Sequence, residues 1–122
     1  MVDEFISYWT DFMNKTDDPM YAFAKKMIEI PKVIFTKTLN KSKLINTELA
    51  KGDLKDEITK LKTQNGKDIL VYGGASFDSS LIKENLIDVF YLFINPIIMG
   101  NGKNTFKDIR DPKTFIIGIK GV

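Results

Sequence analysis

Two short stretches of the 122-residue sequence contain residue types that suit the binding of phosphate groups. In the first stretch, Thr36, Lys37 and Thr38 bring two hydroxyls and an ammonium together. Such groups bind a phosphate monoester through charge-assisted hydrogen bonds. In the second stretch, Gly73 and Gly74 stand directly before a segment with helical spacing. Because glycine has no Cβ, a ligand can approach this part of the backbone closely.

The segment after the glycine pair adds backbone donors. The first N–H groups of an α-helix have no partner inside the helix, and they attract anions. We expect these donors to belong to Ala75, Ser76 and Phe77. The competing interpretation of the glycine pair is a tight turn with close packing. The competing interpretation of Thr36, Lys37 and Thr38 is a solvent-exposed strand end.

The elements around these stretches alternate between helix and strand. Phe5, Trp9 and Phe12 have the spacing of one apolar helix face. Asp17 to Pro19 is typical of a helix start, and Ile30-Pro31 of a helix end. The other predicted helices span residues 53–64, with Asp53 as the N-cap, and 76–84. The predicted strands span residues 33–37, 69–72, 87–94 and 113–119, with a short additional strand at 42–46.

This order predicts an α/β fold with a largely parallel sheet and right-handed crossovers. In such sheets, ligands bind at the carboxyl ends of the strands. Both candidate stretches lie at or just after the end of a predicted strand, so they fall at that end of the sheet. The length suits a single domain spanning residues 1–122.

Composition excludes several kinds of chemistry. The chain has no cysteine and no histidine, and its net charge is only +2. Thiolate catalysis, a histidine base and a nucleic-acid partner are therefore disfavoured, and no metal site is expected. The apolar run from Val89 to Ile94 is too short to span a membrane, and the acidic first residues do not form a signal peptide. We expect a cytoplasmic protein.

Three further residues are better explained by structure than by chemistry. Asp88 is a lone acid in an apolar stretch, and no second acid or histidine lies beside it in sequence. We expect a structural, hydrogen-bonded carboxylate. Gly100 and Gly102 are expected to shape a turn.

The stretches "PKVIFTKTL" and "KDILVYGGASFDSSLIKENLIDVFYLFINPIIMGNGKNTF" together resemble the dihydrofolate-reductase-like family. That family includes the C-terminal reductase domain of the bifunctional riboflavin-biosynthesis enzymes. The resemblance covers roughly residues 31 to 106. It implies a three-layer, mostly parallel twisted sheet with flanking helices and an NADPH-dependent reductase acting on a pterin- or pyrimidine-like small molecule.

The resemblance also implies roles for the two candidate stretches. Thr36, Lys37 and Thr38 would lie by the adenosine 2′-phosphate of NADPH. The pyrophosphate would lie by Gly73, Gly74, Ala75, Ser76 and Phe77. These roles agree with the phosphate chemistry of the residues themselves. No catalytic residue is identified.

The sequence departs from the family pattern in several places. The opening strand and the following helix start of the family are not present, so the chain resembles a form truncated at the N-terminus, and it looks short at the C-terminus. Tyr72 stands where the riboflavin branch favours glutamate, and Val89 where the family often has a carboxylate. These differences favour a poorly defined bacterial branch over a riboflavin-pathway reductase.

Two classes of function remain open at this stage. The first is the NADPH-dependent reductase. The second is a non-catalytic remnant that keeps the fold as a nucleotide-binding or dimerising module. Because the absent part builds one wall of the family's nicotinamide pocket, we expect little or no turnover. A sheet without its first and last strands exposes edges that invite pairing, so we expect a homodimer.

Overall fold

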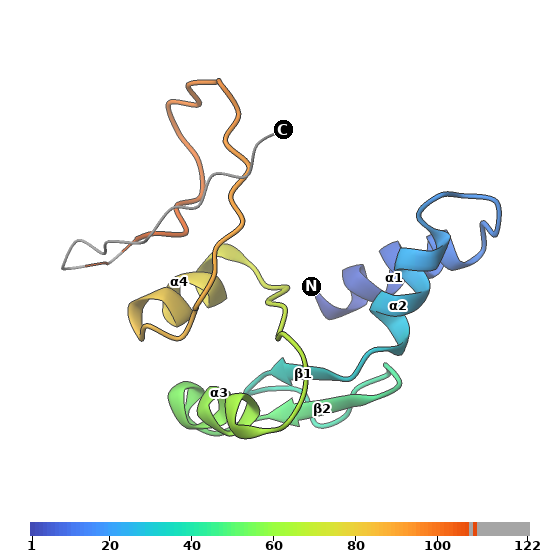
Figure 1. Cartoon of the computed structure of the whole chain (residues 1–122), viewed down its shortest axis with the longest axis horizontal. Helices are drawn as coiled ribbons and strands as arrows, with labels where there is room; N and C mark the ends of the chain where they lie inside the picture. Colours follow the sequence, from blue (N-terminus) through green and yellow to red (C-terminus); the bar gives the residue numbers. More distant parts are fainter. Residues whose placement is uncertain (108, 110–122) are drawn as a thin grey trace. The chain divides into compact units, whose positions relative to one another are not determined.

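The computed structural model describes residues 1–107 and 109 (Figure 1). The chain divides into two compact units, Met1–Asp53 and a second that begins at Leu54. The first contains two helices and a pair of strands, and the described residues of the second contain two helices. The prediction of one domain over residues 1–122 stays a prediction.

The first unit begins with two helices that pack on each other. Helix α1 is Val2–Met13 and helix α2 is Tyr21–Glu29. Their shared core consists of Trp9, Ala24 and Met27. Phe5 and Phe12 pack against this core, which confirms the predicted apolar stripe of α1.

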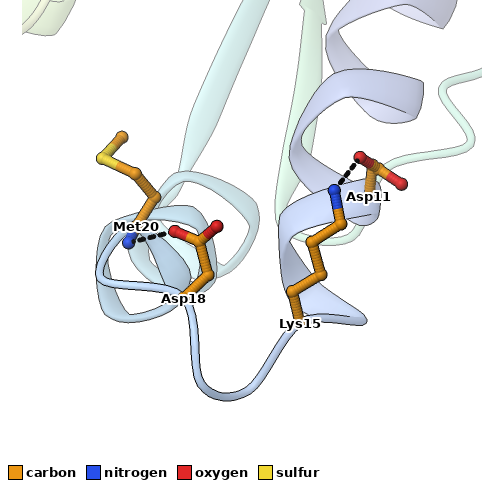
Figure 2. Close-up of polar contacts among 4 residues, drawn as sticks. All are labelled: Asp11, Lys15, Asp18 and Met20. Carbon is orange, nitrogen blue, oxygen red and sulfur yellow. Dashed lines mark hydrogen bonds and ion pairs between the residues drawn. The ribbon is translucent and has the colours of Figure 1, made fainter.

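Polar contacts stabilise the connection between α1 and α2 (Figure 2). At the end of α1, the Lys15 Nζ donates a hydrogen bond to the Asp11 carboxylate over 2.9 Å. Before α2, the Asp18 carboxylate accepts a hydrogen bond of 2.8 Å from the Met20 N–H. The predicted helix start at Asp17 to Pro19 is therefore too early, since α2 begins at Tyr21 with Met20 as its N-cap and without a side-chain cap. The helix ends before Ile30, whose ψ of 147° is extended, as Pro31 predicts.

The strands of the first unit form a parallel pair. Strand β1 is Lys32–Phe35 and strand β2 is Thr47–Ala50. Their register places Lys32 opposite Thr47 and Phe35 opposite Ala50. Strand β1 therefore ends two residues earlier than predicted, and β2 begins just after the predicted strand at 42–46.

The second unit contains helix α3, Leu54–Thr63, and helix α4, Ala75–Lys83. Both agree with the predicted helices, and Asp53 directly precedes α3. Ile58 of α3 and Leu81 and Ile82 of α4 are buried. The Ser79 hydroxyl of α4 donates a hydrogen bond of 3.2 Å to the Lys107 carbonyl.

The predicted strands at 69–72 and 87–94 are wrong for this structure, since neither segment belongs to a strand. The glycine pair therefore precedes a helix, as predicted, but does not follow a strand. The apolar pattern indicates that side chains prefer burial, whereas a strand also needs a neighbour to accept its backbone hydrogen bonds. In the described part of the second unit the only regular elements are helices. The predicted strand at 113–119 lies outside the described residues.

Four helices and a parallel strand pair in the described residues are compatible with an α/β fold. A two-stranded sheet is too small to test the predicted three layers, which stay a prediction. Within the described ranges, no helix is both long and apolar enough to cross a membrane.

The core of the first unit gives a direct test of its packing. Met27 is 5% exposed and Met20 is 39% exposed. We expect Met27→Ala to lower the free energy of unfolding by about 2–5 kcal/mol, because it leaves a cavity. The matched change Met20→Ala should cost no more than about 0.5 kcal/mol. Urea unfolding followed by the fluorescence of Trp9, the single tryptophan, measures both, and equal losses would contradict this core.

Candidate functional site

The first candidate stretch lies at the carboxyl edge of the parallel strand pair. The Thr36 N–H donates a hydrogen bond of 3.1 Å to the Ala50 carbonyl, so pairing continues one residue beyond β1. Because the strands are parallel, the residues after β1 and those after β2 meet at the same edge. Lys51 follows β2, and its Nζ donates a hydrogen bond of 3.0 Å to the Asn40 side chain. The edge thus holds the loop from Thr36 to Asn40 in place.

Thr36 organises that loop. Its Oγ1 accepts hydrogen bonds from the Thr38 N–H, over 3.2 Å, and from the Leu39 N–H, over 3.1 Å. The hydroxyl hydrogen of Thr36 is not used in either bond, and it can donate to a ligand oxygen. Lys37 and Thr38 are exposed. The loop therefore presents the Lys37 ammonium and the Thr38 hydroxyl to solvent, while Thr36 is half-buried.

The second candidate stretch is the start of α4. Gly74 precedes the helix with φ −84° and ψ 164°, and its carbonyl accepts hydrogen bonds from the N–H groups of Phe77 and Asp78 over 2.9 and 3.1 Å. Among the described residues, no group accepts a bond from the Ala75 or Ser76 N–H, and no side chain caps the helix. The sequence predicts three free N–H donors, from Ala75 to Phe77. The structure leaves two, because the Phe77 N–H is already bonded to the Gly74 carbonyl.

Gly73 is explained by packing. A Cβ placed on it would lie 2.7 Å from Cδ1 of the Phe77 ring and 3.1 Å from Oδ1 of Asp78. The competing interpretation of a close-packed turn therefore accounts for Gly73. It does not account for the two free donors that follow Gly74.

Asp78 is a residue that the sequence interpretation missed. Its Oδ1 is shielded from solvent and has no hydrogen-bond partner in the described part of the chain. Burial raises the pKa of this carboxyl above its ordinary value. The signal available in the sequence was an acid in the first turn of the helix that follows the glycine pair. Asp78 belongs to the first turn of α4, so an anion bound at the start of this helix would lie in the same turn as the carboxyl.

Asp88 and Gly100 behave as predicted. Asp88 accepts a hydrogen bond of 2.6 Å from the Nζ of Lys62, which confirms a hydrogen-bonded acid. Gly100 has φ +67°, so it shapes a turn that favours glycine. Residues Met99 to Asn104 line an open hollow of about 490 Å³. The described residues contain no cluster of acids that could hold a metal ion.

Comparisons with known proteins give a consistent result. The sequence profile described as "RibD C-terminal domain" matches residues 9–117. A protein of Bacillus subtilis (strain 168) named "Uncharacterized protein YyaP" is 34% identical over 105 residues, which cover 84% of this chain and 55% of that protein. The chain thus spans about half the length of this curated relative. No solved structure matches.

The unpartnered carboxyl of Asp78 generates a pH-dependent prediction. A folded-state pKa raised above the ordinary 3.8 means that folding favours the protonated form. The ionised Asp78 carboxylate therefore lowers the stability of the folded chain. This loss is absent below that ordinary value, appears as the pH rises through the folded-state pKa, and persists at neutral pH. We expect Asp78→Asn to raise the melting temperature at neutral pH and to make little difference below pH 3.8.

Thermal unfolding of both proteins at the two pH values measures this difference. Asp68→Asn, a change to an exposed carboxylate in the same unit, serves as the matched control and should have little effect. A wild-type chain more stable than Asp78→Asn at neutral pH would contradict the assignment of Oδ1 as an uncompensated buried acceptor.

Proposed function

Because the chain belongs to the family of the RibD C-terminal domain, we propose that it is an NADPH-binding member of this reductase family. The substrate class we propose is a pterin- or pyrimidine-like small molecule, and the setting is the bacterial cytoplasm. The observation that carries the proposal is the pair of uncommitted N–H groups of Ala75 and Ser76, directly after Gly73-Gly74.

The start of α4 supports a pyrophosphate site. Two backbone donors and the positive end of a helix dipole favour anionic oxygens. A hydrogen bond to a charged group contributes about 1.5–3 kcal/mol, so two such bonds supply useful affinity. The Asp78 carboxyl opposes this gain while it is ionised. The donors fit a pyrophosphate, and Asp78 limits the affinity.

The loop after β1 supports a 2′-phosphate site. Lys37 supplies the charge, and the hydroxyls of Thr36 and Thr38 supply directional donors. The bonds from Thr38 and Leu39 to the Thr36 hydroxyl oxygen fix the backbone of the loop. Holding the loop in one conformation reduces the entropy that is lost when a ligand binds.

NADPH, when bound, supplies a hydride to the substrate. In this proposal the chain's own residues bind and orient the phosphate groups of the cofactor, each loop through its own donors.

The alternative is a nucleotide-binding module without turnover. The sequence has no histidine and no cysteine, which favours this alternative. Histidine commonly transfers protons in enzymes, and cysteine is a common nucleophile. Two measurements distinguish these functions. NADPH binding is measured first, and NADPH oxidation is then followed in the presence of a dihydropterin or an aminopyrimidine.

Cofactor preference tests the proposal at Lys37. If Lys37 contacts the 2′-phosphate, the chain should bind NADPH more tightly than NADH. Loss of one charge-assisted contact costs about 1.5–3 kcal/mol, so Lys37→Ala should weaken NADPH binding by roughly tenfold or more. Binding of NADH should change little. Titration of NADPH and NADH fluorescence gives the four dissociation constants.

Lys26→Ala, a matched loss of charge from α2 in the same unit, is the control and should leave the preference unchanged. Equal affinities for the two cofactors, before and after Lys37→Ala, would remove the 2′-phosphate role from this loop.

Gly74→Asp places a carboxylate at the N-cap of α4 and should weaken the binding of both cofactors alike. If both still bind to Gly74→Asp as to the wild type, the pyrophosphate role of α4 is wrong.

A further inference from the structure

Two pairs of neighbouring residues in the chain combine an asparagine with a following glycine. They are Asn65-Gly66 and Asn101-Gly102, and all four residues are exposed. In such a pair the backbone nitrogen of the glycine can attack the side-chain amide carbon of the asparagine, which is one reason why asparagine is a thermolabile residue. Glycine has no Cβ to obstruct the approach. The surroundings of the two pairs differ.

At Asn101 the reacting groups already lie close together. The Gly102 N–H donates a hydrogen bond of 2.9 Å to the Asn101 Oδ1, and this oxygen is bonded directly to Cγ, the carbon that is attacked. The last side-chain torsion of asparagine has a broad energy minimum, so a small rotation turns the carboxamide carbon toward the nitrogen. Within the described residues, Asn65 makes no such contact with Gly66.

A tight turn holds the backbone on the N-terminal side of this contact. Gly100 has φ +67°, and the Asn101 N–H donates a hydrogen bond of 2.7 Å to the Met99 carbonyl. On the other side there is free space, since a Cβ placed on Gly102 would meet no other part of the described chain within 4 Å. Reacting atoms that are held close together in an open approach react faster than atoms that must first find each other.

The charge of the loop also favours the reaction. The nitrogen of Gly102 must lose its proton before it can attack, and a nearby cation favours the anionic form of a group. Lys103 follows directly, and it is the single charged residue from Met99 to Asn104. The Asn65-Gly66 pair is followed by Lys67 and then by Asp68, whose opposite charges offset each other.

We propose that Asn101 is a site of spontaneous conversion to aspartate and isoaspartate, and that the fold makes this conversion faster there than at Asn65. A base takes the proton of the Gly102 N–H, the nitrogen forms a bond to Cγ of Asn101, and the Cγ–Nδ2 bond breaks. The leaving nitrogen takes up a proton and departs as ammonia, which leaves a cyclic succinimide.

Water completes the conversion of the succinimide. Water adds to one of the two ring carbonyls, and the bond from that carbonyl to the ring nitrogen breaks. Addition at Cγ gives aspartate, and addition at the backbone carbonyl gives isoaspartate. The sum is the exchange of water for ammonia, with no oxidation or reduction. This proposal does not depend on the cofactor proposal.

The products change the hollow of about 490 Å³ that Met99 to Asn104 line. Its single charge is the Lys103 ammonium, which favours an anionic ligand. Either product adds a carboxylate next to this ammonium, so the lining becomes neutral and the net charge of the chain falls by one unit from +2. Isoaspartate also lengthens the backbone path of the loop by one carbon. The hollow therefore loses its preference for anions as the chain ages.

Digestion with trypsin and mass spectrometry of the chain after incubation in mildly alkaline buffer test the proposal. Cleavage after lysine releases Asn101 in the peptide 84–103 and Asn65 in the peptide 63–67, so each conversion is followed separately. Fragmentation of the longer peptide separates Asn101 from Asn85 and Asn95. In the folded chain Asn101 should convert about tenfold faster than Asn65, because its reacting groups are held close together. In urea that unfolds the chain, the two rates should become similar.

Two variants serve as matched controls. Gly102→Ala has room for its Cβ, so it should fold and should slow the conversion of Asn101 several-fold, because the new Cβ crowds the attacking nitrogen. Asn101→Gln should abolish the conversion at this position, since glutamine must close a larger ring. Transfer of a labelled methyl group by an isoaspartyl methyltransferase should mark the aged wild-type chain much more strongly than aged Asn101→Gln.

Three results would overturn the proposal. Equal rates at Asn101 and Asn65 in the folded chain would show that the contact between the Gly102 N–H and Oδ1 gives no advantage. A difference that is the same in the folded chain and in urea would assign it to the flanking residues and not to the turn. A stable Asn101 in a chain whose Asn65 converts would show that the turn protects the side chain.

Discussion

The hydrogen-bonded register of β1 and β2 is the constraint on which the first candidate site depends. Parallel pairing brings Phe35 opposite Ala50, so the residues that follow each strand emerge at one edge. The bond from the Thr36 N–H to the Ala50 carbonyl then fixes where the loop begins. A slip of one residue would turn every side chain of the slipped strand to the other face of the pair. The bond from the Thr36 N–H to the Ala50 carbonyl, which fixes the start of the loop, would then be lost.

Local patterns made the helices predictable. The spacing of Phe5, Trp9 and Phe12, the acidic start before α2 and the proline after it all act within a few residues of the chain. Strands need partners that are distant in sequence, and the segments at 69–72 and 87–94 show the consequence. Their apolar composition indicates a preference for burial, but the composition does not say which neighbour would cover them. The described structure leaves both exposed.

The candidate site was predictable to a similar extent. The free donors of Ala75 and Ser76 follow from the helix start, which the glycine pair made recognisable. The bond of the Phe77 N–H to Gly74 and the close approach of Phe77 to Gly73 depend on the exact geometry of the turn. Asp78 was overlooked because an acid in the first turn of a helix is normally favourable. Its penalty arises only from the burial of one oxygen without a partner, which the sequence does not reveal.

The central claim is that the loop after β1 and the start of α4 both bind phosphate groups. The most direct measurement is the change in backbone amide shifts of the ¹⁵N-labelled chain on titration with NADPH and with NADH. The account predicts that the amides of Ala75 and Ser76 shift with both cofactors, and that those of Lys37 and Thr38 shift more strongly with NADPH. Shifts confined to other residues, or the absence of any saturable shift at Ala75 and Ser76, would contradict it.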